Sequence, residues 1–181
     1  MSEQNKKLES IKKSSNVAMI LARVAKIFCF LGTGICIVMG IWFIAFHDYV
    51  NEELQRAVAE GKFDPDELLL EFNQSGLYMA YNDSAQLSET IGIYLIVEGA
   101  ILVIFVVLLH FVSRVFKEIK ESDSPFRKPI LKDMRVVFIL ITLLVLQSGI
   151  LTGVMVGFAL WCVYSVFEYG CGLQQLSDET L

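Results

Sequence analysis

Three long stretches of the sequence are almost free of charged side chains, and they restrict what the chain can fold into. Residues 27–46 and residues 136–167 carry no charge, and residues 91–112 carry one acidic side chain. An α-helix rises about 1.5 Å per residue, so about 20 apolar residues cross the hydrocarbon core of a bilayer. The sequence therefore predicts an integral membrane protein.

The composition supports this interpretation. Hydrophobic residues make up 55% of the 181 residues, and the mean hydropathy is +0.57. A chain of this length forms one small domain, and such an apolar excess excludes a soluble nucleic-acid-binding module. A cleaved signal peptide is the alternative for residues 27–46, but the run is longer than a usual signal core and lacks a small-residue cleavage site.

Charges are divided between the two ends of each apolar run. Residues 1–26 carry six basic and two acidic side chains, residues 47–90 carry two basic and ten acidic, and residues 113–135 carry seven basic and four acidic. Segments rich in Lys and Arg remain in the cytoplasm. We therefore expect the N-terminus and the second basic segment inside, and the acidic segment outside.

The third apolar run is too long for one upright helix and short for two. Three membrane helices remain possible, but we favour four, with a hairpin near residues 148–152 at the outer interface, where backbone groups can be hydrated. The expected class is an all-α, four-helix transmembrane bundle with a short helical extracellular insertion between helices 1 and 2. The expected segments are a cytoplasmic N-terminus (1–26), four membrane helices (27–46, 91–112, 131–149 and 152–172), an external loop (47–90), a cytoplasmic loop (113–130) and a cytoplasmic tail (173–181).

The external segment is expected to hold two short helices. Residues 47–61 have helical spacing that ends at Gly61, and Asp64 with Pro65 forms a typical helix start. Asn73 and Asn82 begin glycosylation acceptor triplets, which matter only in a secretory pathway. The acidic excess could attract a cation such as Ca²⁺, but a solvated surface is the preferred interpretation.

Glu98 is the only acidic side chain within the three apolar runs, and the only basic one is His110, which lies near the end of the same run. Charged groups in a membrane helix are costly and usually face a protein interior or a cavity. On the four-helix topology Thr142 and Trp161 lie at the same depth, so the three form a predicted intramembrane polar site. It is either a proton or cation site or a protonated structural contact.

Three glycines, Gly149, Gly153 and Gly157, recur every four residues and allow two helix backbones to approach closely. They pack helices within the bundle or form a homodimer face, and the hairpin could use Gly149. The four cysteines show no CxxC pair and indicate no zinc site. Because no catalytic or phosphate-binding motif is present, we expect no enzyme activity, metal or cofactor.

Residues 113–135 form a basic segment with a turn at Ser124–Pro129. Anionic lipid headgroups are the default partner of such residues. A protein is the sharper alternative, with Phe126 and Arg127 as contacts.

The turn at Pro125 and Phe126, the basic run into the third apolar helix, and the C-terminal sequence resemble a bacterial membrane family known as domain of unknown function 2975. The resemblance covers mainly residues 113–181. The matching terminal residues are Phe167, Gly170, Leu173, Gln174, Asp178, Glu179, Thr180 and Leu181. The large acidic loop and the short connection before the fourth helix depart from the family's shortest members.

The resemblance implies a four-helix protein of the bacterial inner membrane with both termini in the cytoplasm, often encoded beside a small helix-turn-helix regulator. It therefore predicts a non-enzymatic regulatory or sensory partner of a DNA-binding protein, with no direct nucleic-acid binding. Phe126, Arg127, Leu173, Gln174, Asp178, Glu179 and Thr180 are the expected partner-binding residues. The alternative is a small transporter or ion-conducting homo-oligomer that uses Glu98.

Overall fold

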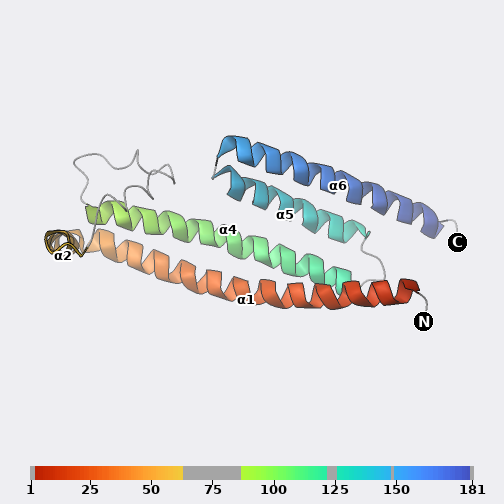
Figure 1. Cartoon of the computed structure of the whole chain (residues 1–181), viewed down its shortest axis with the longest axis horizontal. Helices are drawn as coiled ribbons and strands as arrows, with labels where there is room; N and C mark the ends of the chain where they lie inside the picture. The colour runs from red at the N-terminus through yellow and green to blue at the C-terminus, as the bar shows by residue number, and fades with distance from the viewer. Residues whose placement is uncertain (1–2, 63–86, 122–125, 148, 180–181) are drawn as a thin grey trace. The chain divides into compact units, whose positions relative to one another are not determined.

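The computed structural model describes residues 3–62, 87–121, 126–147 and 149–179, and all regular structure in these ranges is α-helical (Figure 1). The helices are α1 (Glu3–Ala45), α2 (His47–Ala59), α4 (Leu87–Glu121), α5 (Lys128–Leu146) and α6 (Ile150–Glu179). The expected second outer helix at Asp64 and the two glycosylation triplets lie outside the described residues.

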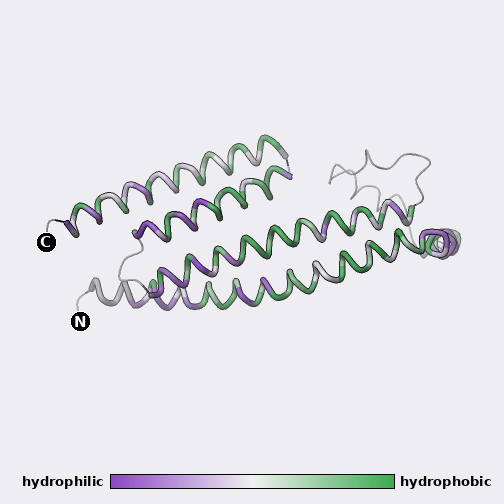
Figure 2. The backbone as a smooth tube through the Cα atoms, turned by 180° about the vertical axis from the view of Figure 1, so that it is seen from behind, coloured by the Kyte–Doolittle hydropathy of each residue, from purple (hydrophilic) through white to green (hydrophobic). Residues whose placement is uncertain are grey.

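Three of the helices are long and apolar enough to cross a membrane. The spans are Glu9–Ala45, Leu87–Glu121 and Ile150–Ser177, and only 6%, 11% and 6% of their apolar windows are buried within the protein. Figure 2 shows the hydrophobic stretches of these helices in green. Large apolar side chains left exposed in this way require a surrounding that is not water, which indicates a membrane protein.

Several helix boundaries differ from the sequence expectation, and α4 extends beyond both ends of the expected segment 91–112. Helix α1 begins at Glu3, so the basic N-terminal segment continues the first apolar run as one helix of 43 residues. Helix α5 begins at Lys128, three residues before the expected start, because Pro129 favours the first turn of a helix. Helix α6 continues to Glu179, since the residues after Gly172 include no helix breaker. The expected tail is therefore largely helical.

Contacts divide the chain into two units, which we call unit 1 (residues 1–28 and 104–181) and unit 2 (residues 29–103). In unit 2, α1 and α4 run antiparallel and touch through glycines. A β-carbon at Gly92 would lie 2.9 Å from the carbonyl oxygen of Gly40, and one at Gly99 would lie 3.0 Å from Ile37. At Gly92 the two backbones approach too closely for a β-carbon, as expected for apolar helices in lipid, whereas at Gly99 the Ile37 side chain would have to shift.

In unit 1, the N-terminal part of α1 lies beside the C-terminal part of α4. The Lys120 ammonium donates a hydrogen bond of 2.8 Å to the Asn16 side-chain oxygen. Ser15, Met19 and Ala22 are buried at 4%, 7% and 6% exposure on one face of α1. Residues 15–22 of the basic N-terminal segment thus lie in a packed part of α1, which the sequence did not predict.

Helices α5 and α6, also in unit 1, form an antiparallel hairpin (Figure 1). Gly149 lies in the turn with φ of +149°, a conformation that side chains other than glycine rarely adopt. Its amide donates to the Leu146 carbonyl oxygen at 3.2 Å, and its own carbonyl accepts from Gly153 at 2.9 Å. Gly149 is thus used by the turn.

Candidate functional site

Gly153 and Gly157 face α5 within the hairpin. A β-carbon at Gly153 would lie 2.6 Å from the Leu146 side chain, and one at Gly157 would lie 2.9 Å from the methyl group of Thr142. Both glycines are therefore in close contact with α5 of the same chain. This placement favours packing within the bundle over a homodimer face for these residues.

A groove of about 550 Å³ lies between α5 and α6 and contains two of the three residues of the predicted polar site, Thr142 and Trp161. The α5 side is lined by Arg135, Phe138, Ile139, Thr142 and Leu143, and the α6 side by Gly157, Leu160, Trp161, Tyr164 and Glu168. On each helix these residues follow the three- and four-residue spacing of a single face. The groove is thus a continuous strip along both helices.

Polar groups gather at one end of the groove. Arg135 lies in the first half of α5 and Glu168 lies late in α6, so the antiparallel arrangement brings them to the same end. Within the described residues neither side chain forms an ion pair. The Thr142 hydroxyl donates to the Phe138 carbonyl oxygen at 2.8 Å, so its proton is already engaged within α5.

Glu98 lies half-buried in α4, next to the close contact of Gly99 with α1. Glu98 belongs to unit 2, whereas Thr142 and Trp161 belong to unit 1. The proposed three-residue site therefore stays a prediction. Within the described residues, no hydrogen bond or ion pair forms at the Glu98 carboxylate.

The end of α4 is joined to the start of α5 by a buried acidic side chain. Asp133 is 3% exposed, and its Oδ2 lies 2.8 Å from Nε of Arg114, which also lies 3.7 Å from Glu118. The geometry is an ion pair without an aligned hydrogen bond, because Oδ2 has no hydrogen-bond partner among the described residues. The sequence analysis did not predict this pair. The sequence signal that could have indicated the pair is Asp133 itself, an isolated acidic residue between the basic residues Lys132 and Arg135.

Phe126 packs on α6 instead of standing free. Its ring centroid lies 5.5 Å from that of Phe167, and a β-carbon at Gly170 would lie 2.7 Å from Phe126 Cδ1. The ring is still 37% exposed. The contact brings the two predicted partner-binding segments, the one at Phe126 and Arg127 and the one near the chain end, next to each other.

The last turns of α6 carry exposed apolar side chains. Leu173 and Leu176 are 51% and 62% exposed, and their three-residue spacing puts them on neighbouring positions of the helix surface. Gln175 donates a hydrogen bond of 3.1 Å to Glu179 across one turn. Gln174 and Asp178 also lie in this helix, and Thr180 lies outside the described residues.

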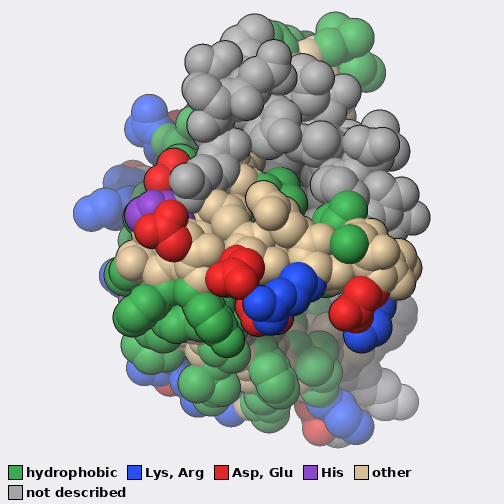
Figure 3. Space-filling model, turned by 90° about the vertical axis from the view of Figure 1, so that its left-hand side faces the viewer, with side chains coloured by type: hydrophobic (Ala, Val, Ile, Leu, Met, Phe, Trp, Pro, Cys, Tyr) green, Lys and Arg blue, Asp and Glu red, His purple; other side chains and the backbone are tan. Residues whose placement is uncertain are grey.

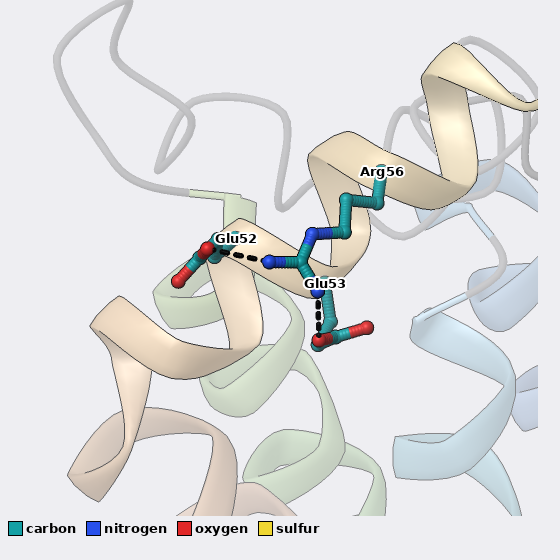
Figure 4. Close-up of polar contacts among 3 residues, drawn as sticks. All are labelled: Glu52, Glu53 and Arg56. Carbon is teal, nitrogen blue, oxygen red and sulfur yellow. Dashed lines mark hydrogen bonds and ion pairs between the residues drawn. The ribbon is translucent and has the colours of Figure 1, made fainter.

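Helix α2 partly neutralises its own acidic residues. Arg56 pairs with Glu52 at 2.7 Å and with Glu53 at 3.0 Å (Figure 4). Figure 3, which looks onto α2, shows basic side chains beside acidic ones there. In the described part of the chain, no three His, Cys, Asp or Glu side chains are placed to hold a metal ion. Within α2, these pairs favour a solvated surface over a Ca²⁺ site, and the acidic residues at 63–86 lie outside the described residues.

Helix α2 also holds the start of α4. The Ser88 amide donates a hydrogen bond of 3.1 Å to the Asn51 side-chain oxygen, and the Ser88 hydroxyl donates to the His47 carbonyl oxygen at 3.3 Å. The first amides of a helix lack partners within the helix, so Asn51 acts as a cap supplied by another helix. Ser88 is fully buried as a result.

No family model, curated protein sequence or solved structure matches this chain.

Proposed function

We propose that the chain is a four-helix protein of the bacterial inner membrane, with α5 as the fourth span and both termini in the cytoplasm. Helix α5 packs along α6 at Gly153 and Gly157, so it accompanies α6 wherever that helix lies. Its charged residues, Lys128, Lys132, Asp133 and Arg135, fall in its first half. That half then faces the cytoplasm, as the distribution of Lys and Arg requires.

Within this topology, the proposed function is that of a non-enzymatic regulatory or sensory membrane protein which binds a small helix-turn-helix transcription regulator. The observation that carries the proposal is the contact of Phe126 with Gly170. It joins the connection between α4 and α5 to the last part of α6, so that both segments contribute to one surface. The resemblance to domain of unknown function 2975 supplies the class of partner.

The length of α6 supports this surface. Its 30 residues extend about 45 Å, whereas the hydrocarbon core is about 30 Å thick. The last turns therefore project beyond the core on the cytoplasmic side. Leu173 and Leu176 would be exposed to water there, and exposed apolar groups next to charged ones are typical of a protein contact.

The test is pull-down of the tagged full-length protein from native membranes, followed by a search for a helix-turn-helix regulator among the co-purified proteins. Exchanging both Leu173 and Leu176 for Ser should reduce capture at least tenfold, because two apolar contacts of about 1 kcal/mol or more are lost. The matched control is Leu151→Ser, an exposed leucine at the opposite end of α6. Equal capture by all variants would remove the proposal.

The second candidate is a small transporter or ion-conducting oligomer, which the half-buried Glu98 in α4 favours. A carboxylate in a membrane helix marks ion or proton paths in many proteins. Proton and cation flux into vesicles containing the purified protein would test it. Loss of flux in Glu98→Gln but not in Glu89→Gln supports this function, and vesicles without flux exclude it for the ions tested.

A further inference from the structure

The groove between α5 and α6 combines an apolar strip with one doubly charged end. Phe138, Ile139, Leu143 and Leu160 form the strip. Arg135 and Leu143 are eight residues apart, which is about 12 Å along a helix. A volume of about 550 Å³ lies within the range of sites that enclose small molecules. An elongated ligand with an apolar body and a polar end therefore fits the groove.

The two charges determine which polar end fits. Arg135 and Glu168 line the same groove, yet within the described residues they form no ion pair. A purely anionic headgroup would be repelled by Glu168, and a purely cationic one by Arg135. A zwitterionic headgroup satisfies both side chains at once.

We propose that this groove binds an amine-bearing zwitterionic phospholipid of the phosphatidylethanolamine class, with its phosphate on Arg135, its ammonium on Glu168 and one acyl chain along the apolar strip. Guanidinium groups bind phosphate by charge-assisted hydrogen bonds. Tyr164 lies one turn before Glu168 in the same wall, and its hydroxyl is a further donor for the phosphate.

A primary ammonium is preferred to a quaternary one for a physical reason. It donates hydrogen bonds to a carboxylate, as lysine does, whereas a choline headgroup has no N–H. Choline headgroups are recognised by cages of several aromatic rings. Trp161 lies seven residues from Glu168, about 10 Å along α6, so of the two aromatic residues on the α6 side of the groove only Tyr164 lies within about one turn of Glu168.

The position of the groove in the membrane agrees with this occupant. In the proposed topology, Arg135 and Glu168 lie toward the cytoplasmic leaflet, and the strip leads from them toward the turn at Gly149. A phospholipid of that leaflet is oriented in the same way, with its headgroup at the charged end. Arginine side chains near helix ends reach toward the headgroups.

The experiment measures lipid retained by the purified full-length protein, by native mass spectrometry. The protein is exchanged against phosphatidylethanolamine, phosphatidylcholine and phosphatidylglycerol with identical acyl chains. We expect about tenfold preference for phosphatidylethanolamine over each of the others, the size of one charge-assisted contact. Arg135→Gln should lower its retention about tenfold.

Glu168→Gln provides a test that misfolding cannot imitate. This variant should bind phosphatidylglycerol more tightly than the wild type, because the repulsion of an anionic headgroup is removed. The matched controls are Lys132→Gln on α5 and Glu121→Gln at the end of α4, which carry the same charge changes outside the groove and should leave the preference unchanged.

Three results would overturn the proposal. They are equal retention of the three lipids by the wild type, an unaltered preference in both Arg135→Gln and Glu168→Gln, and disulfide crosslinking of Ile139→Cys to a second copy of the chain. The last result would mean that another protein chain occupies the groove. Protection of Ile139→Cys from thiol reagents only when phosphatidylethanolamine is present would support the lipid.

Discussion

The ring of Phe126 covers Gly170 so closely that a β-carbon there would lie 2.7 Å from Phe126 Cδ1. Gly170→Ala must therefore displace the ring and cost about 1–3 kcal/mol, as overpacking does. Gly172 is the matched control, because a β-carbon there meets nothing within 4 Å. Gly172→Ala should be neutral or stabilise the helix by up to about 1 kcal/mol. Reversible unfolding in mixed detergent measures both.

Capture of the regulator gives a second measurement on the same pair of variants. If the contact shapes the partner surface, Gly170→Ala weakens capture several-fold and Gly172→Ala does not. Equal stability and equal capture in the two variants would show that the contact of the Phe126 ring with Gly170 contributes neither to stability nor to partner binding.

The ion pair of Arg114 with Asp133 leads to a second prediction. Asp133 is 3% exposed, so Arg114→Leu leaves a buried carboxylate without its cation and should cost about 3 kcal/mol. Asp133→Asn removes the buried negative charge and, with it, the free-energy cost of keeping that charge away from water. It should therefore destabilise the protein less than Arg114→Leu. Unfolding free energies of both variants and the double variant give the coupling energy. A coupling near zero would contradict the structural role of the pair.

Close backbone contact in unit 2 makes Gly92 sensitive to any side chain. A β-carbon at Gly92 would lie 2.6 Å from Ile44 and 2.9 Å from the Gly40 carbonyl oxygen, whereas one at Gly34 meets nothing within 4 Å. We expect Gly92→Ala to lower the unfolding temperature by several degrees and Gly34→Ala to leave it unchanged or raise it. The reverse order of the two variants would refute this packing.

The cap that Asn51 provides to α4 can be removed without changing either helix core. Asn51→Ala should cost about 1 kcal/mol, the usual cost of a lost helix cap, and should speed hydrogen exchange at the Ser88 amide about fivefold or more. Asn51→Asp keeps the acceptor oxygen and should retain most of the protection. Amide exchange followed by mass spectrometry distinguishes these results. Unchanged exchange in Asn51→Ala would show that the bond contributes nothing.

Reporter fusions decide between three and four membrane spans. A cytoplasmic reporter after Leu181 and another after Ser2 should both be active in bacterial cells. An external reporter placed in residues 63–86 should be active as well. An active external reporter after Leu181 would mean an odd number of spans and would contradict both the topology and the resemblance.

The long helices were predictable from sequence because apolar runs of 20 residues have few other solutions in lipid. The ends of these helices were harder to predict. Helix α5 begins at Lys128 and α6 ends at Glu179, and the polar residues around both positions are also compatible with loops. Thr142 and Trp161 were expected at one depth, and they do line one groove. The sequence analysis did not predict that Arg135 and Glu168 line the same groove, because their proximity depends on the register between α5 and α6. The register is fixed by contacts such as Gly157 with Thr142, which periodicity alone does not reveal.

The turn at Gly149 has a consequence for how the protein is made. Residues 147–149 span about 10 Å at most when extended, a third of the hydrocarbon thickness, so Leu146 and Ile150 cannot be left on opposite faces of the bilayer. Helix α5 carries four charges in its first half and is a poor candidate to enter lipid by itself. We expect insertion of α5 to be delayed until α6 has emerged from the ribosome, so that the two helices enter the membrane together as one hairpin.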